Sequence, residues 1–294
     1  MLFEDATRVV AGRGRMVDQP PFLFLHIPRT AGTTLNCLLE RNFPPGAVLS
    51  LYSREDFEQN AVIDRSRLDG IRLIQGHVLL TDYDAFTFYD APVRAVTFLR
   101  EPVSRVISEY HFLRTWPEQH LYDLLNRENI SLAEYVTSDR KLLRYKGGNF
   151  MTRVLSGLDP DSRPEEALSR AKSNLRDRFV AFGLTEDFDA SLLLLADVMG
   201  LADLLYERQN SLRRPEAARA TDEERELVAS RNVLDAALHQ FAKELFAARV
   251  AAGGKAFAIR LARHKLLVAK FRKLCCLLDA RAGASGGAIE NPKK

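Results

Sequence analysis

The sequence has few cysteines, and they are not arranged to form a structural framework. Among 294 residues there are three, Cys37, Cys275 and Cys276. Adjacent cysteines rarely pair with each other, and the chain contains no CxxC motif or Cys/His cluster. Neither a disulfide framework nor a zinc site is indicated, and we expect no metal.

The chain also lacks a strong charge of one sign and a long apolar run. Its net charge is only +3, which argues against nucleic acid as a partner. Residues 1–20 carry charges throughout and have no apolar core of the signal-peptide type. No uncharged apolar run approaches the roughly 20 residues that a membrane span requires. We therefore expect a cytoplasmic protein, and the hydrophobic share of 46% is typical of a soluble globular one.

Short apolar runs alternate with segments of helical periodicity. The runs at 22–27, 71–78, 94–99 and 179–183 predict buried strands, and helices are expected after the first, third and fourth of them. This alternation predicts an α/β fold in which helices cover both faces of a parallel sheet. Thr33 or Thr34 is expected to cap the first helix. Thr221 and Glu224 form a capping-box pattern that predicts one long helix to about residue 250, ended by glycines 253 and 254.

These patterns divide the chain into four parts. Residues 1–20 form an N-terminal segment, and 21–253 form the main domain. A basic amphipathic helical extension is expected over 254–281, and a flexible Gly/Ala/Ser tail over 282–294.

The loop Pro28-Arg-Thr-Ala-Gly-Thr-Thr34 has the composition of an anion-binding turn. A strand that enters a helix N-terminus presents backbone N–H groups and the positive end of the helix dipole to phosphate or sulfate oxygens. Ala31 and Gly32 allow close approach, while Thr30, Thr33 and Thr34 add hydroxyls and Arg29 a permanent charge. The Walker pattern GxxxxGK[ST] is absent, so the loop suits an anion that needs no metal. A plain strand-turn-helix with capping threonines remains the alternative.

A second segment, from Arg94 to Leu113, offers a phosphate clamp. Arg100 stands at the predicted end of a strand, where parallel sheets bind ligands, and Ser108 lies two helical turns further on. The alternative is an amphipathic helix with solvated arginines.

Together these two segments resemble the sulfotransferases that use 3′-phosphoadenosine 5′-phosphosulfate (PAPS), most closely the heparan sulfate 2-O-sulfotransferase-like branch and its bacterial relatives. The matching stretches are His26-Ile-Pro-Arg-Thr-Ala-Gly-Thr-Thr34, Arg100-Glu-Pro-Val-Ser-Arg-Val-Ile-Ser-Glu-Tyr110 and Gly76-His77-Val78. The resemblance implies a P-loop-NTPase-like sheet, with the 5′-phosphosulfate on the first stretch and the 3′-phosphate on Arg100 and Ser108. It also implies His77 as catalytic base, PAP as product and a hydroxyl acceptor, most simply of a carbohydrate.

The chain departs from this family at Arg29, where relatives usually have lysine. Arginine keeps the charge but cannot lose its proton, so only electrostatic stabilisation of the leaving oxygen is compatible with it. Histidine suits the task of a base near neutral pH, and His77 stands at a predicted strand end. A strand-end histidine bonded to a carbonyl is the structural alternative. His26 is expected to orient the loop.

Other basic residues are candidate contacts to cofactor or acceptor, namely Arg105, Arg153 and Arg214. For Arg105 a surface salt bridge is the competing interpretation. The basic apolar segment 255–278 is compatible with packing on the domain, with contact to an anionic membrane surface, or with recruitment of a polyanionic acceptor.

Two other functions remain open. One is a P-loop kinase or nucleotide hydrolase, against which the missing Walker lysine counts. The other is a non-catalytic nucleotide-binding relative, which the Arg29 departure alone supports.

Overall fold

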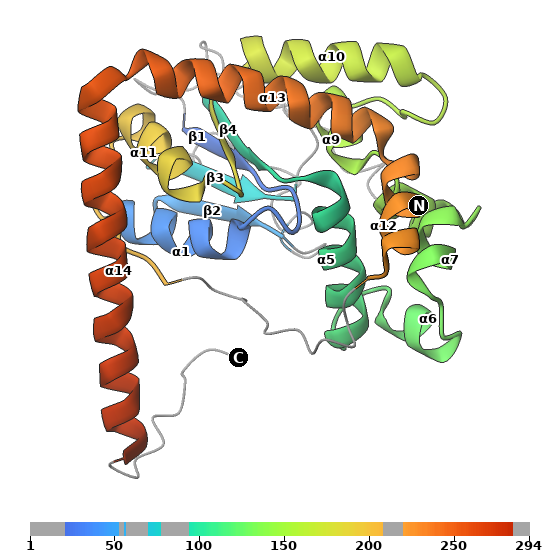
Figure 1. Ribbon diagram of the computed structural model, residues 1–294, viewed down its shortest axis with the longest axis horizontal. Coiled ribbons are helices and arrows are strands. Elements are labelled where there is room, and N and C mark those ends of the chain that lie inside the picture. The colour runs from blue at the N-terminus through green and yellow to red at the C-terminus, as the bar shows by residue number, and fades with distance from the viewer. Residues whose placement is uncertain (1–20, 53–55, 57–69, 78–93, 208–219, 285–294) are drawn as a thin grey trace.

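The computed structural model describes residues 21–52, 56, 70–77, 94–207 and 220–284. Within these residues the last strand is β5 (Phe179–Leu184), and only helices follow it (Figure 1). The strands are β1 (Phe22–Leu25), β2 (Val48–Leu51), β3 (Leu73–Gly76), β4 (Arg94–Leu99) and β5 (Phe179–Leu184). The helices are α1 (Gly32–Asn42), α5 (Pro102–Thr115), α6 (Tyr122–Arg127), α7 (Leu132–Thr137), α8 (Lys141–Gly147), α9 (Phe150–Ser156), α10 (Pro164–Asp177), α11 (Phe188–Met199), α12 (Asp222–Arg231), α13 (Val233–Ala252) and α14 (Gly254–Ala284).

The five strands form one parallel sheet in the order β2-β3-β1-β4-β5. β1 is central, with Phe22 level with Leu73 of β3 on one side and Arg94 of β4 on the other. The predicted α/β class is confirmed, and the central strand runs directly into the loop before α1. All strands therefore end at the same edge of the sheet, which is where open parallel sheets bind ligands.

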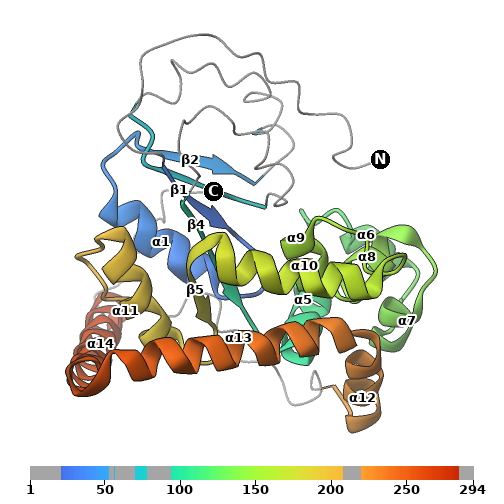
Figure 2. The ribbon, with the colours of Figure 1, turned by 90° about the horizontal axis from the view of Figure 1, so that it is seen from above.

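Alternate side chains of the central strand enter two different cores. Leu23 and Leu25 belong to a cluster with α9, α10 and α13, whereas Phe22 and Phe24 belong to one with α1 and α11. This period of two is the expected consequence of strand geometry. Figure 2 shows α10 and α13 on one side of the sheet and α1 on the other. A third cluster joins α5, α6, α7 and α12 beside the sheet.

The helix expected over 221–250 is two helices. The predicted capping box is present at Thr221 and Glu224, but α12 ends at Arg231 and α13 begins at Val233. Asn232, fully buried between them, donates to the carbonyl oxygens of Gly147 and Val228. The long-range contact to the end of α8 therefore fixes the break, while Gly253 follows the end of α13 as expected.

The N-termini of α9 and α13 cap each other. Asp235 accepts hydrogen bonds from the backbone N–H groups of Met151 (3.0 Å) and Thr152 (2.7 Å). In return Asn149 accepts from the N–H groups of Leu234 (3.0 Å) and Asp235 (3.2 Å). Each helix thus supplies the side chain that satisfies the first N–H groups of the other.

Helix α14 runs along one edge of the molecule and extends past the sheet (Figure 1). Its Phe257 and Val268 enter the two main cores, and Arg260 forms an ion pair with Asp197 of α11 at 2.6 Å. The helix reaches Ala284, so residues 282–284 of the expected tail are helical, and 285–294 lie outside the described residues. Among the described helices, none combines the length and apolar character needed to cross a bilayer.

Candidate active site

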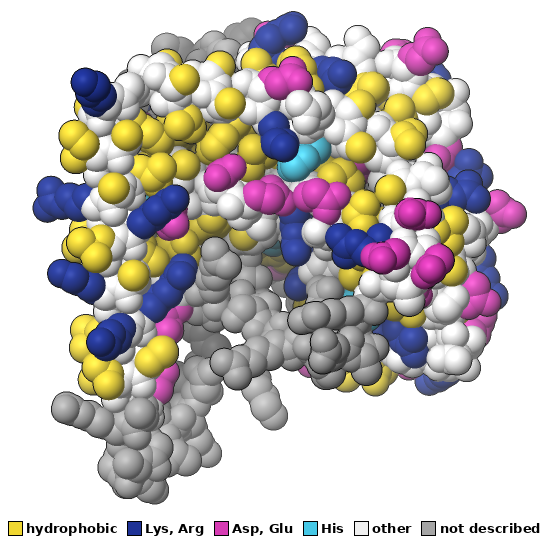
Figure 3. All heavy atoms as spheres, viewed as in Figure 1, with side chains coloured by type: hydrophobic (Ala, Val, Ile, Leu, Met, Phe, Trp, Pro, Cys, Tyr) yellow, Lys and Arg dark blue, Asp and Glu magenta, His cyan; other side chains and the backbone are white. Residues whose placement is uncertain are grey.

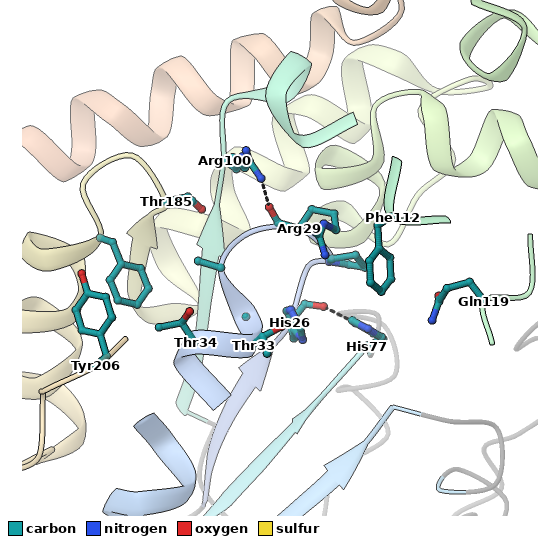
Figure 4. A pocket seen from close by; sticks show the side chains of 14 residues that line it. His26, Arg29, Thr33, Thr34, His77, Arg100, Phe112, Gln119, Thr185 and Tyr206 are labelled. Atoms are coloured by element: carbon teal, nitrogen blue, oxygen red, sulfur yellow. Dashed lines mark hydrogen bonds between the residues drawn. The ribbon is translucent and has the colours of Figure 1, made fainter. Parts of the chain in front are cut away.

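A cavity of about 390 Å³ opens where four strands end. The loop after β1 lines it, together with His77 after β3, Arg100 after β4 and Thr185 after β5. Figure 4 shows these side chains converging between Tyr206 at one end and Phe112 and Gln119 at the other. The parallel topology alone accounts for this convergence, because strands that run the same way bring the residues that follow them to one edge.

Two residues of the loop before α1 have an unusual backbone conformation. Arg29 and Ala31 both have left-handed backbones, with φ of 68° and 67°. The helix begins at Gly32 without a side-chain cap and without an acidic residue in its first turn. The expectation that Thr33 or Thr34 caps it is wrong, because both residues lie inside the first turn. The first residues of α1 line the cavity, so the positive end of the helix dipole lies beside it, which suits an anion.

The residues of the loop divide into cavity-lining and structural ones. Arg29, Ala31, Gly32, Thr33 and Thr34 line the cavity. Thr30, which was also predicted to bind the anion, does not line the cavity. It is fully buried, and its hydroxyl donates to the carbonyl oxygen of Ile27 at 2.7 Å. That threonine holds the turn in shape rather than facing a ligand.

The two predicted motifs meet through the loop arginine. The Nε of Arg29 donates to Oγ of Ser108 at 3.1 Å, and the guanidinium of Arg29 lies 4.6 Å from the ring centre of Phe112. Arg100 donates to the carbonyl oxygen of Arg29 at 3.0 Å (Figure 4). The loop and the arginine-serine pair thus form one site. Ser108 itself is buried behind the arginine and does not line the cavity.

Two histidines stand beside the loop. Nδ1 of His77 lies 2.9 Å from the carbonyl oxygen of His26, and the two ring centres are 4.7 Å apart (Figure 4). Nδ1 of His26 lies 3.3 Å from the hydroxyl of Tyr52, which also receives a hydrogen bond from Asn36 at 2.6 Å. Because a carbonyl can only accept, Nδ1 of His77 carries the proton in the neutral ring and Nε2 holds the lone pair.

Both imidazoles are held in the neutral form. The atoms packed around the ring lower the pKa of His77 below the ordinary 6.5, and the Lys146 charge adds to this effect. The hydrogen bond to His26 opposes it but does not outweigh it. Burial lowers the pKa of His26 well below 6.5, and its electrostatic interactions with His77 and Arg29 act in the same direction. A neutral imidazole at pH 7 is the form a proton acceptor needs.

A buried charge cluster lies beyond the cavity wall. Arg105 is completely buried, 4.0 Å from Glu109, and donates to the carbonyl oxygen of Lys146 at 3.2 Å. Lys146 lies 3.9 Å from the same carboxylate, and burial lowers its pKa. The expectation of a ligand contact or a surface salt bridge at Arg105 is therefore wrong, because neighbouring helices enclose the side chain.

The predicted contact at Arg153 does not reach the cavity. Arg153 pairs with Asp159 and, at 3.1 Å, with Asp161, and it does not line the cavity. These local carboxylates explain its position. Arg214 lies outside the described residues.

Sequence reasoning missed part of the cavity wall. The unpredicted lining residues are His26, Pro28, Phe112, Gln119, Thr185, Phe188 and Tyr206. Thr185 directly follows β5, which ends one residue beyond the predicted strand, so the rule that placed Arg100 at a strand end points to this position. Gln119 and Tyr206 follow helices, in segments without any local signal. Within the described parts of the chain, no group of three His, Cys, Asp or Glu residues is placed to hold a metal ion.

The chain is similar to known sulfotransferases. It is 26% identical to galactosylceramide sulfotransferase of Bos taurus over 317 aligned positions, which cover 98% of this chain and 71% of that protein. A solved structure of mouse sulfotransferase SULT7A1 complexed with PAP aligns with 73% of this chain at 14% identity and a TM-score of 0.34. The chain covers 65% of that protein's length. No protein-family model matches the sequence.

Proposed function

We propose that this protein is a PAPS-dependent sulfotransferase that transfers a sulfuryl group to a hydroxyl of a glycan or glycolipid. The observation that carries the proposal is the meeting of the α1 N-terminus, Arg29, Arg100 and His77 in one cavity. Similarity to galactosylceramide sulfotransferase over nearly the whole chain supports it and favours an acceptor that bears a sugar. The fit is chemical as well, because PAPS is an anion at several positions and the cavity offers fixed cations and backbone donors.

The residues of this chain would divide the work as follows. The N–H groups at the start of α1, with Thr33 and Thr34, hold the phosphosulfate end. Arg100 supplies positive charge for the 3′-phosphate. Arg29 stabilises the charge that develops on the bridging oxygen as its bond to sulfur breaks. Ser108 orients Arg29 through the hydrogen bond at 3.1 Å, so it acts as a positioning residue.

The acceptor would approach from the side of His77. Its oxygen forms the new bond to sulfur in line with the departing phosphate oxygen, and its proton passes to Nε2 of His77. The bond from Nδ1 to the His26 carbonyl orients the ring and stabilises the imidazolium that forms. PAP leaves with the electron pair of the broken bond, so protons and charge balance without a metal.

The test uses the purified full chain, calorimetry with PAP, and transfer of labelled sulfate from PAPS to a panel of glycolipids, oligosaccharides and phenols. We expect PAP to bind without magnesium and label to appear on a sugar-bearing acceptor. Absence of PAP binding, or binding of ATP with magnesium in its place, would overturn the proposal in favour of a kinase or hydrolase. PAP binding without transfer to any acceptor would favour a non-catalytic relative.

A further inference from the structure

Helix α14 carries two parallel stripes of opposite character. Its inner stripe packs on the protein and consists of Phe257, Leu261, His264, Val268, Phe271 and Cys275. The same spacing shifted by two residues gives an outer stripe of Ile259, Arg263, Leu266, Lys270, Lys273 and Leu277. With 3.6 residues per turn, a shift of two residues is close to half a turn, so the outer stripe faces away from the body.

The outer stripe is both apolar and basic. Ile259, Leu266 and Leu277 are 70%, 55% and 54% exposed, and Leu274 beside them is 53% exposed. Residues 255–278 contain seven Lys and Arg residues and no Asp or Glu. Figure 3 shows hydrophobic and basic side chains side by side along this edge. Several large apolar side chains exposed on one helix indicate a surface that another body covers.

We propose that the outer stripe of α14 docks on an anionic membrane surface, with the helix lying in the plane of the headgroups. Exposed leucine and isoleucine side chains enter the acyl boundary, while the lysine and arginine stems reach back to the phosphates. Both halves of the stripe then find a complementary partner, which gives the pattern its physical reason.

The alternative occupants each leave half of the stripe unsatisfied. A second copy of the chain would cover the leucines but bring two like-charged helices together. A polyanionic glycan would satisfy the cations but leave the leucines in water. The lipid surface is the occupant that matches the charge and the apolar area together.

The docking helix is also joined to the cavity. Arg272 of α14 lies over the ring of Tyr206 at 4.7 Å, and His264 lies 3.4 Å from Asp189, to which the Tyr206 hydroxyl donates at 2.9 Å. Tyr206 lines the cavity. The membrane-facing helix therefore braces one wall of the candidate active site.

Vesicle sedimentation of the full chain tests the inference. We expect binding to vesicles of phosphatidylcholine mixed with phosphatidylglycerol, weak binding to phosphatidylcholine alone, and weakening by salt. The variant Arg263→Glu/Lys270→Glu/Lys273→Glu should lose about tenfold or more of its affinity for the anionic vesicles. The variant Ile259→Gln/Leu266→Gln/Leu277→Gln should also lose affinity, because the apolar contribution is removed while the charge is kept.

A matched control separates the stripe from overall charge. Arg170→Glu/Arg225→Glu/Lys243→Glu makes the same change in net charge at exposed positions of α10, α12 and α13, and should bind like the parent. Circular dichroism checks the folding of each variant. We expect the α14 variants to fold because no inner-stripe residue is altered. Equal losses in the control and α14 charge variants would overturn the inference. Failure to bind anionic vesicles would also overturn the inference. In that case, dimers that the apolar variant abolishes would indicate a second copy of the chain as the occupant. Heparin retention that only the charge variant abolishes would indicate a polyanionic glycan.

Discussion

Nε of Arg29 donates a hydrogen bond to Oγ of Ser108 at 3.1 Å, joining the loop after β1 to helix α5 across 79 positions of sequence. The contact carries the arginine side chain out of the loop and onto the ring of Phe112. A lysine at this position would have the charge but not the planar donor set that makes both contacts together. Where the resembling family usually has lysine, Arg29 is therefore held by its own contacts to Ser108 and Phe112.

Variants of Arg29 should show how much of the transfer activity depends on its positive charge and how much on its donor geometry. In Arg29→Ala we expect kcat/KM for sulfate transfer to fall by about 100-fold or more, because a fixed positive charge near the leaving oxygen is lost. Arg29→Lys should retain more activity than the alanine variant, and Ser108→Ala should cost about tenfold through poorer positioning. Transfer assays with labelled PAPS measure all three. Unchanged activity in Arg29→Ala would contradict the assigned role.

His77→Gln should abolish transfer but leave nucleotide binding intact. We expect kcat to fall by about 100-fold to 10,000-fold, the usual contribution of a general base, while the Kd for PAP changes little. Calorimetry and single-turnover transfer measure the two quantities separately. His120→Gln is the matched control, since that histidine is exposed and does not line the cavity. Parallel losses of binding and transfer in the His77 variant would instead indicate a structural role.

The pH profile should have its acidic limb below pH 6.5. A base works when neutral, and packing of the ring lowers the pKa of His77, so kcat/KM should rise with pH through that lowered pKa and then level off. Lys146→Gln removes a positive charge that favours the neutral ring, so the limb should move to higher pH. A limb that stays in place in this variant would show that another group controls the profile.

Gly32→Ala should be destabilising because of His26. A Cβ atom at this glycine would lie 1.7 Å from Nε2 of that ring, so the imidazole would have to move. We expect a loss of about 1–3 kcal/mol in the free energy of unfolding. In the double variant His26→Ala/Gly32→Ala the loss from the added methyl should disappear. Urea denaturation of the two single variants and the double variant forms the cycle, and simple additivity would refute the contact.

Removing the Asp235 carboxylate should destabilise the fold without touching the cavity. Asp235→Ala leaves the N–H groups of Met151 and Thr152 buried without their acceptor. We expect a loss of about 2 kcal/mol or more in the free energy of unfolding. Asp235→Asn keeps one acceptor oxygen and should lose less. Thermal or urea denaturation measures both, and an equal loss would assign the effect to charge rather than to hydrogen bonding.

The sequence predicted those elements whose signal is local. The four apolar runs became β1, β3, β4 and β5, and Arg100 and His77, which were predicted to stand at strand ends, line the cavity. β2 was missed because it is only partly buried along most of its length, and among the described strands it lies at the edge of the sheet. An edge strand of that kind has no continuous apolar run to distinguish it.

The failures of prediction come from contacts between distant segments. Arg105 was predicted to contact a ligand or to form a surface salt bridge, but residues of α8 and α9 enclose it. The break at Asn232 depends on the carbonyl of Gly147, 85 positions away. The capping role given to Thr33 and Thr34 failed for a different reason. The helix begins at Gly32, after the left-handed backbone at Ala31, two or three residues earlier than a cap at Thr33 or Thr34 would place it.

The reciprocal capping of α9 and α13 has a consequence for how the molecule opens. Neither helix can fray from its first turn without stripping acceptors from the other, so the two should exchange their amide hydrogens as one cooperative unit. These two helices pack on one face of the sheet, and the cavity lies at the edge where the strands end. When the residues that line the cavity open transiently, α9 and α13 should therefore stay folded.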